Sequence, residues 1–254
     1  MFPPSPARRL CVLVDAGGTP CALDALCVRG VEASAGTEGV QDLSQLLGGA
    51  PEPGAGLVVS LDVPAGMALR VRQVHGVVDV GGARAHLLPA GVSPRLSCMA
   101  RGALELEGKL FLDVDLLALD GELPAADPPA GPMQPAGAPE GRALVFRVGA
   151  QAWTVALSAV TQVVQTQGIC PTPGRSAALV SHAGALWPVY ALGERLGTGG
   201  TVVLGEHAGR PFGLIADEVL GIFEQLEPAG QRGSWSAPGA TWTASGLDLA
   251  LLFA

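Results

Sequence analysis

Aromatic residues and lysine are scarce in this chain of 254 residues. Phe, Trp and Tyr together make up 4% of the sequence, and Lys109 is its single lysine. The formal net charge is −8, and no run of basic residues is longer than Arg8-Arg9. Phosphate backbones are bound by concentrated positive faces. The composition therefore argues against nucleic acid as a partner.

Long hydrophobic runs are also missing. Glycine, proline or a charged residue interrupts every apolar stretch within about eight residues, whereas a membrane helix needs about 20. The apolar run after Arg8-Arg9 stops at Asp15, which is too soon for a secretory signal. We interpret Leu10 to Asp15 as a first strand, and we expect no direct insertion into a membrane.

The five cysteines form no C-x-x-C pair, and their odd number leaves one unpaired in any disulfide scheme. They are Cys11, Cys21, Cys27, Cys98 and Cys170. Free thiols are typical of a reducing compartment. The sequence thus favours a cytoplasmic protein.

Motifs that carry catalysis or bind cofactors are lacking as well. The four histidines, His75, His86, His182 and His207, have no second ligand at metal-binding spacing. Ser181 and His182 are neighbours on an expected strand, so their side chains point to opposite faces. Asp113 and Asp115 share a strand face but stand where a helix starts, a place where Asp usually caps. We expect no enzyme activity, metal or cofactor.

What the chain does have is many turns and an aliphatic core. Hydrophobic residues make up 48%, and there are 36 Gly and 21 Pro. This composition predicts an all-β fold of many short strands. Expected strands span 10–15, 21–31, 57–63 and 67–80, with two more around Glu107-Gly108; a short helical turn is expected in 40–48, and Arg70 and Arg72 are expected to face outward.

One segment cannot form a core. Residues 124–141 contain six Pro, three Gly and five Ala, which is typical of an extended spacer. We therefore predict a flexible tail at 1–9, a first domain at 10–123, a linker at 124–141 and a second domain at 142–254. The first domain carries most of the negative charge, with nine basic and fourteen acidic residues in 7–123.

The two predicted domains repeat one plan. Residues 144–163 align with 12–31 at a constant offset of 132, which places Gly149 on Gly17. Residues 204–223 align with 59–78 at an offset of 145, and Asp248 falls on Asp115. This repetition predicts two tandem copies of one fold.

The second copy resembles the CheW family of chemotaxis coupling proteins. The resemblance rests on four segments in the family's order: LVFRVGAQAWTVAL, ICPTPGRSAALV, LWPVYALGERL and PFGLIADEVLGIF. It implies two tandem CheW-like domains, each of two small five-stranded SH3-like β-barrels with short helices. The first copy is degenerate, because eleven residues separate Val31 from Leu43 where twenty-eight separate the equivalent Val163 and Leu192.

The resemblance also implies a partner-binding segment. The family's Asn-Leu-Arg-Gly falls on Ser181-His182-Ala183-Gly184, which keeps the glycine but has alanine in place of the arginine of the receptor-coupling neighbourhood. We predict that Val180, Ser181, His182, Ala183 and Gly184 bind a partner. Trp235 and Trp242, which are flanked by Gly, Ser and Pro, are further candidates for exposed anchors. Trp153 and Trp187 are expected in the core.

Three functions remain open at this point. The first is a non-enzymatic adaptor in chemotaxis-like signalling, whose partners are a CheA-type histidine kinase, a chemoreceptor or a related CheW-like protein. The second keeps the fold but serves as a self-associating or polarity-related scaffold that binds no chemoreceptor. The third is a small β-barrel enzyme or ligand-binding protein.

Overall fold

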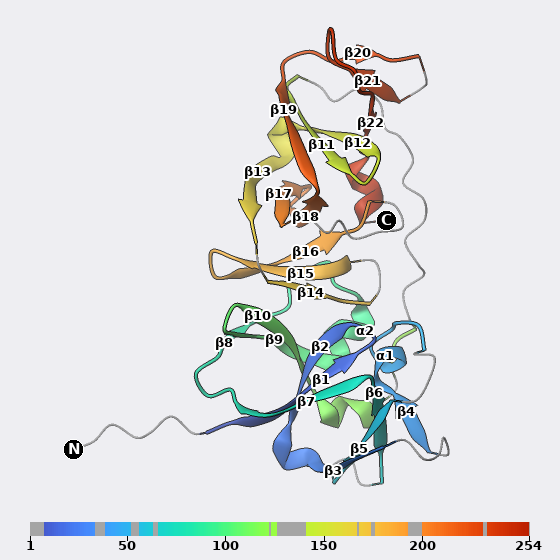
Figure 1. The fold of residues 1–254 in the computed structure, drawn as a ribbon, viewed down its shortest axis with the longest axis vertical. Coiled ribbons are helices and arrows are strands. Elements are labelled where there is room, and N and C mark those ends of the chain that lie inside the picture. Colours follow the sequence, from blue (N-terminus) through green and yellow to red (C-terminus); the bar gives the residue numbers. More distant parts are fainter. Residues whose placement is uncertain are drawn as a thin grey trace, which may run out of the picture. The chain divides into compact units, whose positions relative to one another are not determined.

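The computed structural model describes residues 8–33, 39–51, 56–62, 66–121, 123–125, 141–166, 168–173, 176–192, 200–230 and 233–253. Most of the predicted tail and linker lies outside these residues. The chain divides into two compact units (Figure 1). Unit 1 contains the described residues of 1–128 together with those of 168–174 and 181–186. Unit 2 contains those of 129–167, 175–180 and 187–254.

Unit 1 has two sheets. The first has the strand order β7-β1-β2-β10-β9-β8 and the second the order β3-β5-β6-β4. The strands are β1 (Leu10–Ala16), β2 (Thr19–Asp24), β3 (Val28–Ala33), β4 (Val40–Asp42), β5 (Leu57–Leu61), β6 (Ala68–Val71), β7 (Gln73–Asp79), β8 (Arg84–His86), β9 (Ala100–Leu106) and β10 (Lys109–Val114).

Four short helices connect or flank these strands. They are η1 (Ala25–Cys27), α1 (Leu43–Leu46), α2 (Pro94–Met99) and η2 (Leu116–Asp120). Their first turns are capped by side-chain oxygens of Asp24, Asp42, Ser93 and Asp115, each of which accepts from a backbone N–H. Each cap satisfies a backbone N–H in the first turn of its helix.

The second half of the chain also forms two sheets, with the orders β19-β11-β12-β22-β21-β20 and β13-β17-β18-β16-β15-β14. The strands are β11 (Ala143–Val148), β12 (Gln151–Ala156), β13 (Val160–Gln165), β14 (Ile169–Pro171), β15 (Ser176–His182), β16 (Ala185–Tyr190), β17 (Thr201–His207), β18 (Arg210–Ala216), β19 (Glu218–Phe223), β20 (Glu227–Pro228), β21 (Ser234–Ser236) and β22 (Ala244–Gly246). The helices are η3 (Leu157–Ala159) and η4 (Leu249–Leu252).

Irregularities in the ladders repeat between the halves. The β1–β7 ladder shifts register beside Gly76, and the β11–β19 ladder shifts beside Gly221. Both glycines have positive φ, 130° and 142° respectively, a region that a side chain disfavours. The two positions differ by 145, the offset at which the sequences align. The internal repeat therefore extends to the bulges.

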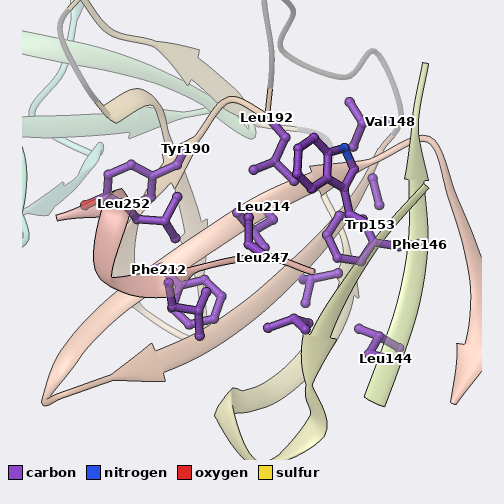
Figure 2. Packing of buried hydrophobic residues seen from close by; sticks show 14 residues of the cluster. Leu144, Phe146, Val148, Trp153, Tyr190, Leu192, Phe212, Leu214, Leu247 and Leu252 are labelled. Atoms are coloured by element: carbon purple, nitrogen blue, oxygen red, sulfur yellow. The ribbon is translucent and has the colours of Figure 1, made fainter. Parts of the chain in front are cut away.

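The core of unit 2 is built from the inward faces of its two sheets and from the C-terminal turn (Figure 2). Phe146 and Trp153 lie together at one end, Tyr190 and Phe212 lie at the other, and Leu214 lies between them. The cluster comprises Leu144, Phe146, Val148, Trp153, Val155, Tyr190, Leu192, Val203, Phe212, Leu214, Ala216, Leu247, Leu249 and Leu252.

The all-β prediction with short helices and two sheets in each half is confirmed. The sheets have six, four, six and six strands, instead of the five expected of each barrel. The four-stranded sheet belongs to the first half, where only β4 and the turn α1 lie between Val31 and Leu47 in the described residues. The shorter sequence between Val31 and Leu43 therefore corresponds to a sheet with four strands instead of six.

Some local predictions were wrong. The strand expected over 21–31 is interrupted by η1, because the Asp24 carboxylate accepts from Leu26 N–H and turns the chain. The connection before Met99 contains α2, which no prediction included. Arg70 and Arg72 were placed correctly: Arg70 is half-buried on the face of β6 opposite the buried Leu69 and Val71, and Arg72 is exposed.

Candidate partner-binding surfaces

The first predicted surface, residues 180–184, is the end of β15 and the turn into β16. Ala183 and Gly184 form a two-residue turn with φ of 51° and 82°. Both residues are exposed, and His182 and Ser181 are half-buried. Val180 is fully buried, so its side chain offers no surface to a partner. The accessible part of this surface is therefore the turn itself.

Ser181 takes part in a polar cluster within unit 1. Its Oγ donates to Glu105 Oε2 at 3.0 Å, and His86 Nε2 lies 2.8 Å from the same oxygen. The His86 side chain is 2% exposed, and that of Glu105 is 27% exposed. Hydrogen bonds from His86 and, to a smaller extent, from Ser181 hold the pKa of Glu105 below its usual value, although burial opposes this. The cluster fixes Ser181 in a structural contact.

The two tryptophans of the second predicted surface are half-buried in unit 2. Trp242 packs edge-on against Phe223, with ring centroids 5.2 Å apart and planes at 66°. Trp235 lies on β21 and pairs with Ala244, and its buried Nε1 has no acceptor among the described residues. Each indole thus exposes only part of its surface to a partner. Trp153 is buried as expected, and Trp187 is half-buried.

The predicted site residues do not form one constellation. Residues 181–184 belong to unit 1, whereas Val180 and both tryptophans belong to unit 2. The predicted binding role of all seven residues stays a prediction. The sequence did not predict the contacts of Ser181 with Glu105 and of Glu105 with His86. These residues lie 76 and 19 positions apart, and an alternating strand pattern gives no signal for such a pairing.

Exposed apolar side chains mark the edge strands. Val77 on β7 is 62% exposed, and Ile222 on β19 is 50% exposed. These two residues occupy equivalent positions at the offset of 145, and each strand stands at the end of its sheet. Val219 on β19 adds a further exposed apolar side chain. Unpaired strand edges with apolar side chains are surfaces that another β protein can cover.

The carboxylates considered for catalysis have structural partners. Asp115 caps η2 by accepting from Leu117 N–H, as predicted, and also binds Arg101 at 2.8 Å, which lowers the pKa of Asp115. Asp113 caps no helix; it lies inside β10 and forms a two-point ion pair with Arg9. In the described part of the chain, no group of three or more His, Cys, Asp or Glu residues is placed to hold a metal ion.

Each described thiol is free of disulfides, and three of the five are buried. Burial raises the pKa of Cys11 to about 11 and that of Cys170 to about 12. Thiols of this kind stay protonated near neutral pH and are poor nucleophiles. Within the described residues, no helix has the length and hydropathy that a membrane span requires.

The repeated two-sheet plan defines a β-domain protein whose candidate sites are turns and strand edges. Residues 142–248 match the family model of the CheW-like domain, and they are a CheW-like domain. The scaffolding protein TtCheW from Thermoanaerobacter tengcongensis, known from a crystal structure, is similar at 19% sequence identity. That similarity covers 45% of this chain and 88% of TtCheW, with a TM-score of 0.37. No curated protein sequence matches the chain.

Proposed function

We propose that this protein is a non-enzymatic adaptor of chemotaxis-like signal transduction that binds the regulatory domain of a CheA-type histidine kinase. The observation that carries the proposal is the CheW-like domain at 142–248, which contains the family's four segments in order. The partner is a β-domain protein, and apolar residues at strand edges supply the contact. The proposed location is the cytoplasm.

The proposed kinase-binding surface is the edge strand β19 of unit 2. Ile222 and Val219 are 50% and 37% exposed there. Burying such side chains against a partner strand contributes roughly 25 cal/mol per Å² of apolar area. The backbone groups of an edge strand add hydrogen bonds without any catalytic residue.

The test is isothermal titration calorimetry with the purified regulatory domain of a CheA-type kinase. We expect a dissociation constant on the order of micromolar and about a tenfold weakening by Ile222→Asp, equal to about 1.4 kcal/mol. Val77→Asp, at the equivalent position of unit 1, is the matched control and should leave binding unchanged. Absence of heat with the kinase domain and with CheW-like proteins would refute the proposal.

A second candidate function is that of a scaffold that shares the fold but binds no chemoreceptor. It is favoured by the turn Ala183-Gly184, which lacks the arginine of the family motif. A receptor-tip fragment should then bind the native chain at least tenfold more weakly than it binds Ala183→Arg. Ala208→Arg is the matched control, because Ala208 has nearly the same backbone conformation, with φ of 50° against 51°.

Equal receptor binding by the native chain and by Ala183→Arg would remove this second candidate. Self-association would be seen in sedimentation velocity as a species whose mass rises with concentration above 25.6 kDa.

A further inference from the structure

Unit 1 is assembled from segments that are far apart in the sequence. Its sheets come from the first half of the chain, but residues 168–174 and 181–186 also belong to it. The first of these segments contains β14, which packs on β2 and β10. The first half has no described counterpart of β14 and β15 in its own four-stranded sheet.

Residues 168–173 lie against β10, the β9–β10 turn and Gly49. Cys170 is fully buried, and its thiol interacts with the backbone of Leu112 on β10. Gly168 lies against the β9–β10 turn so closely that a Cβ would stand 2.6 Å from the Gly108 carbonyl oxygen. A Cβ on Gly49 would meet Pro173 Cβ at 3.4 Å. This segment therefore fits unit 1 without space for larger side chains.

Residues 181–186 are held by a polar contact. Ser181 Oγ donates to Glu105 Oε2, which also binds the buried His86. The Glu105 carboxylate thus has partners on β8 and β15, and an approaching protein would have to replace the hydroxyl group to satisfy it. Apolar and polar contacts both join these two segments to the first half.

We propose that residues 168–173 and 181–186 are a docking element that the first half of the same chain occupies. The buried side of this element is then closed to outside proteins unless they displace it from β2, β10 and Glu105, whereas the turn Ala183-Gly184 stays exposed. This proposal does not depend on the proposed kinase binding by β19, because it rests only on contacts within unit 1.

The test is the rate of thiol alkylation by N-ethylmaleimide, resolved by peptide mass spectrometry on the full chain. Cys98 is exposed and serves as the internal reference, whereas Cys21 and Cys170 are fully buried. We expect both to react at least 100-fold more slowly than Cys98. Alkylation of native Cys170 at the rate of Cys98 would overturn the proposal.

The variant Gly168→Val is designed to displace residues 168–173 from β10, because its side chain collides with the Gly108 carbonyl group. We expect it to accelerate alkylation of Cys170 and Cys21 at least tenfold. Gly82→Val is the matched control, because a Cβ at Gly82 meets nothing within 4 Å, and its rates should equal those of the native chain. A folded Gly168→Val chain with unchanged protection of Cys170 would refute the docking role.

A second variant keeps the proposal testable if Gly168→Val does not fold. Glu105→Gln combined with Ser181→Ala removes the polar contact and should speed amide hydrogen exchange of Ile169 and Cys170 several-fold. Unchanged exchange would contradict the proposal. Protection of Cys170 that falls on dilution would also overturn it, because the docking element would then be occupied by a second copy of the chain.

Discussion

The ion pair between Arg9 and Asp113 allows a sharp test of how unit 1 is held together. Arg9 precedes β1, and Asp113 lies inside β10; the guanidinium donates to both carboxylate oxygens at 2.9 and 2.6 Å. The Asp113 side chain is 8% exposed, whereas that of Arg9 is 34% exposed. The pKa of Arg9 is raised mainly by the hydrogen bond to Asp113. Removing Arg9 therefore leaves a buried carboxylate, whereas removing Asp113 leaves a guanidinium that is partly exposed to water.

Arg9→Met leaves a buried carboxylate without its cation, which we expect to cost about 3 kcal/mol in the free energy of unfolding. Asp113→Leu leaves a guanidinium that reaches water, and the expected loss is about 1 kcal/mol, as for exposed pairs. The double variant removes both charges and should lie within about 1 kcal/mol of the native chain. The order of the three variants is the prediction.

The assay uses the uneven distribution of aromatic residues. All four tryptophans and the single tyrosine belong to unit 2, so intrinsic fluorescence in urea reports on unit 2 and serves as the control. Hydrogen exchange of β1 and β10 reports on unit 1. A loss for Asp113→Leu that equals or exceeds the loss for Arg9→Met would refute the reasoning, as would a double variant whose loss is the sum of the two.

Three further predictions concern pH and packing. Hydrogen bonding from His86 holds the pKa of Glu105 below its usual value. The ionised Glu105 therefore contributes its full stabilisation of the fold at a pH above the usual pKa, and this contribution is lost as the pH falls through the lowered pKa. Glu105→Gln should therefore flatten the acid side of a urea-midpoint profile from about pH 6 to 3, and an unchanged profile would contradict this. Gly205→Ala should destabilise unit 2 by about 2 kcal/mol or more, because its Cβ collides with a backbone carbonyl oxygen and a phenyl ring; a fluorescence midpoint equal to that of the native chain would disprove it. Phe146→Ala should cost about 3–5 kcal/mol in the fluorescence transition, and a loss under about 1 kcal/mol would show that the core is not packed around this ring.

The elements that were predictable from sequence are those set by local chemistry. Alternation and turn residues placed β1, β9 and β10 to within a residue or two, and the leucine spacing located α1. The helix α2 was missed although Ser93-Pro94 carries a local start signal, because Ser is a capping residue and Pro is favoured in the first turn. The sequence signal for this helix was therefore present but was not recognised.

The polar cluster around Glu105 was not predictable in the same way. Glu105 alternates with the buried Leu104 on β9, so its side chain lies on the other face of that strand. Its partners His86 and Ser181 lie 19 and 76 residues away, and neither spacing has a local signature. Long-range pairing is decided by how strands pack, so only the structure brings these three side chains together. For the same reason, the sequence placed 180–184 on a free surface without its contact to the first half.

Three tight hairpin turns, Glu107-Gly108, Ala183-Gly184 and Ala208-Gly209, have a left-handed first residue that is not glycine, with φ near 50° in each. Asparagine is the residue usually found there, because it tolerates this conformation. The chain contains no asparagine at all, so each turn accepts a strain of about 1 kcal/mol. In exchange, the turns lack the thermolabile Asn side chain. The hairpins should therefore resist chemical ageing during long storage or heating.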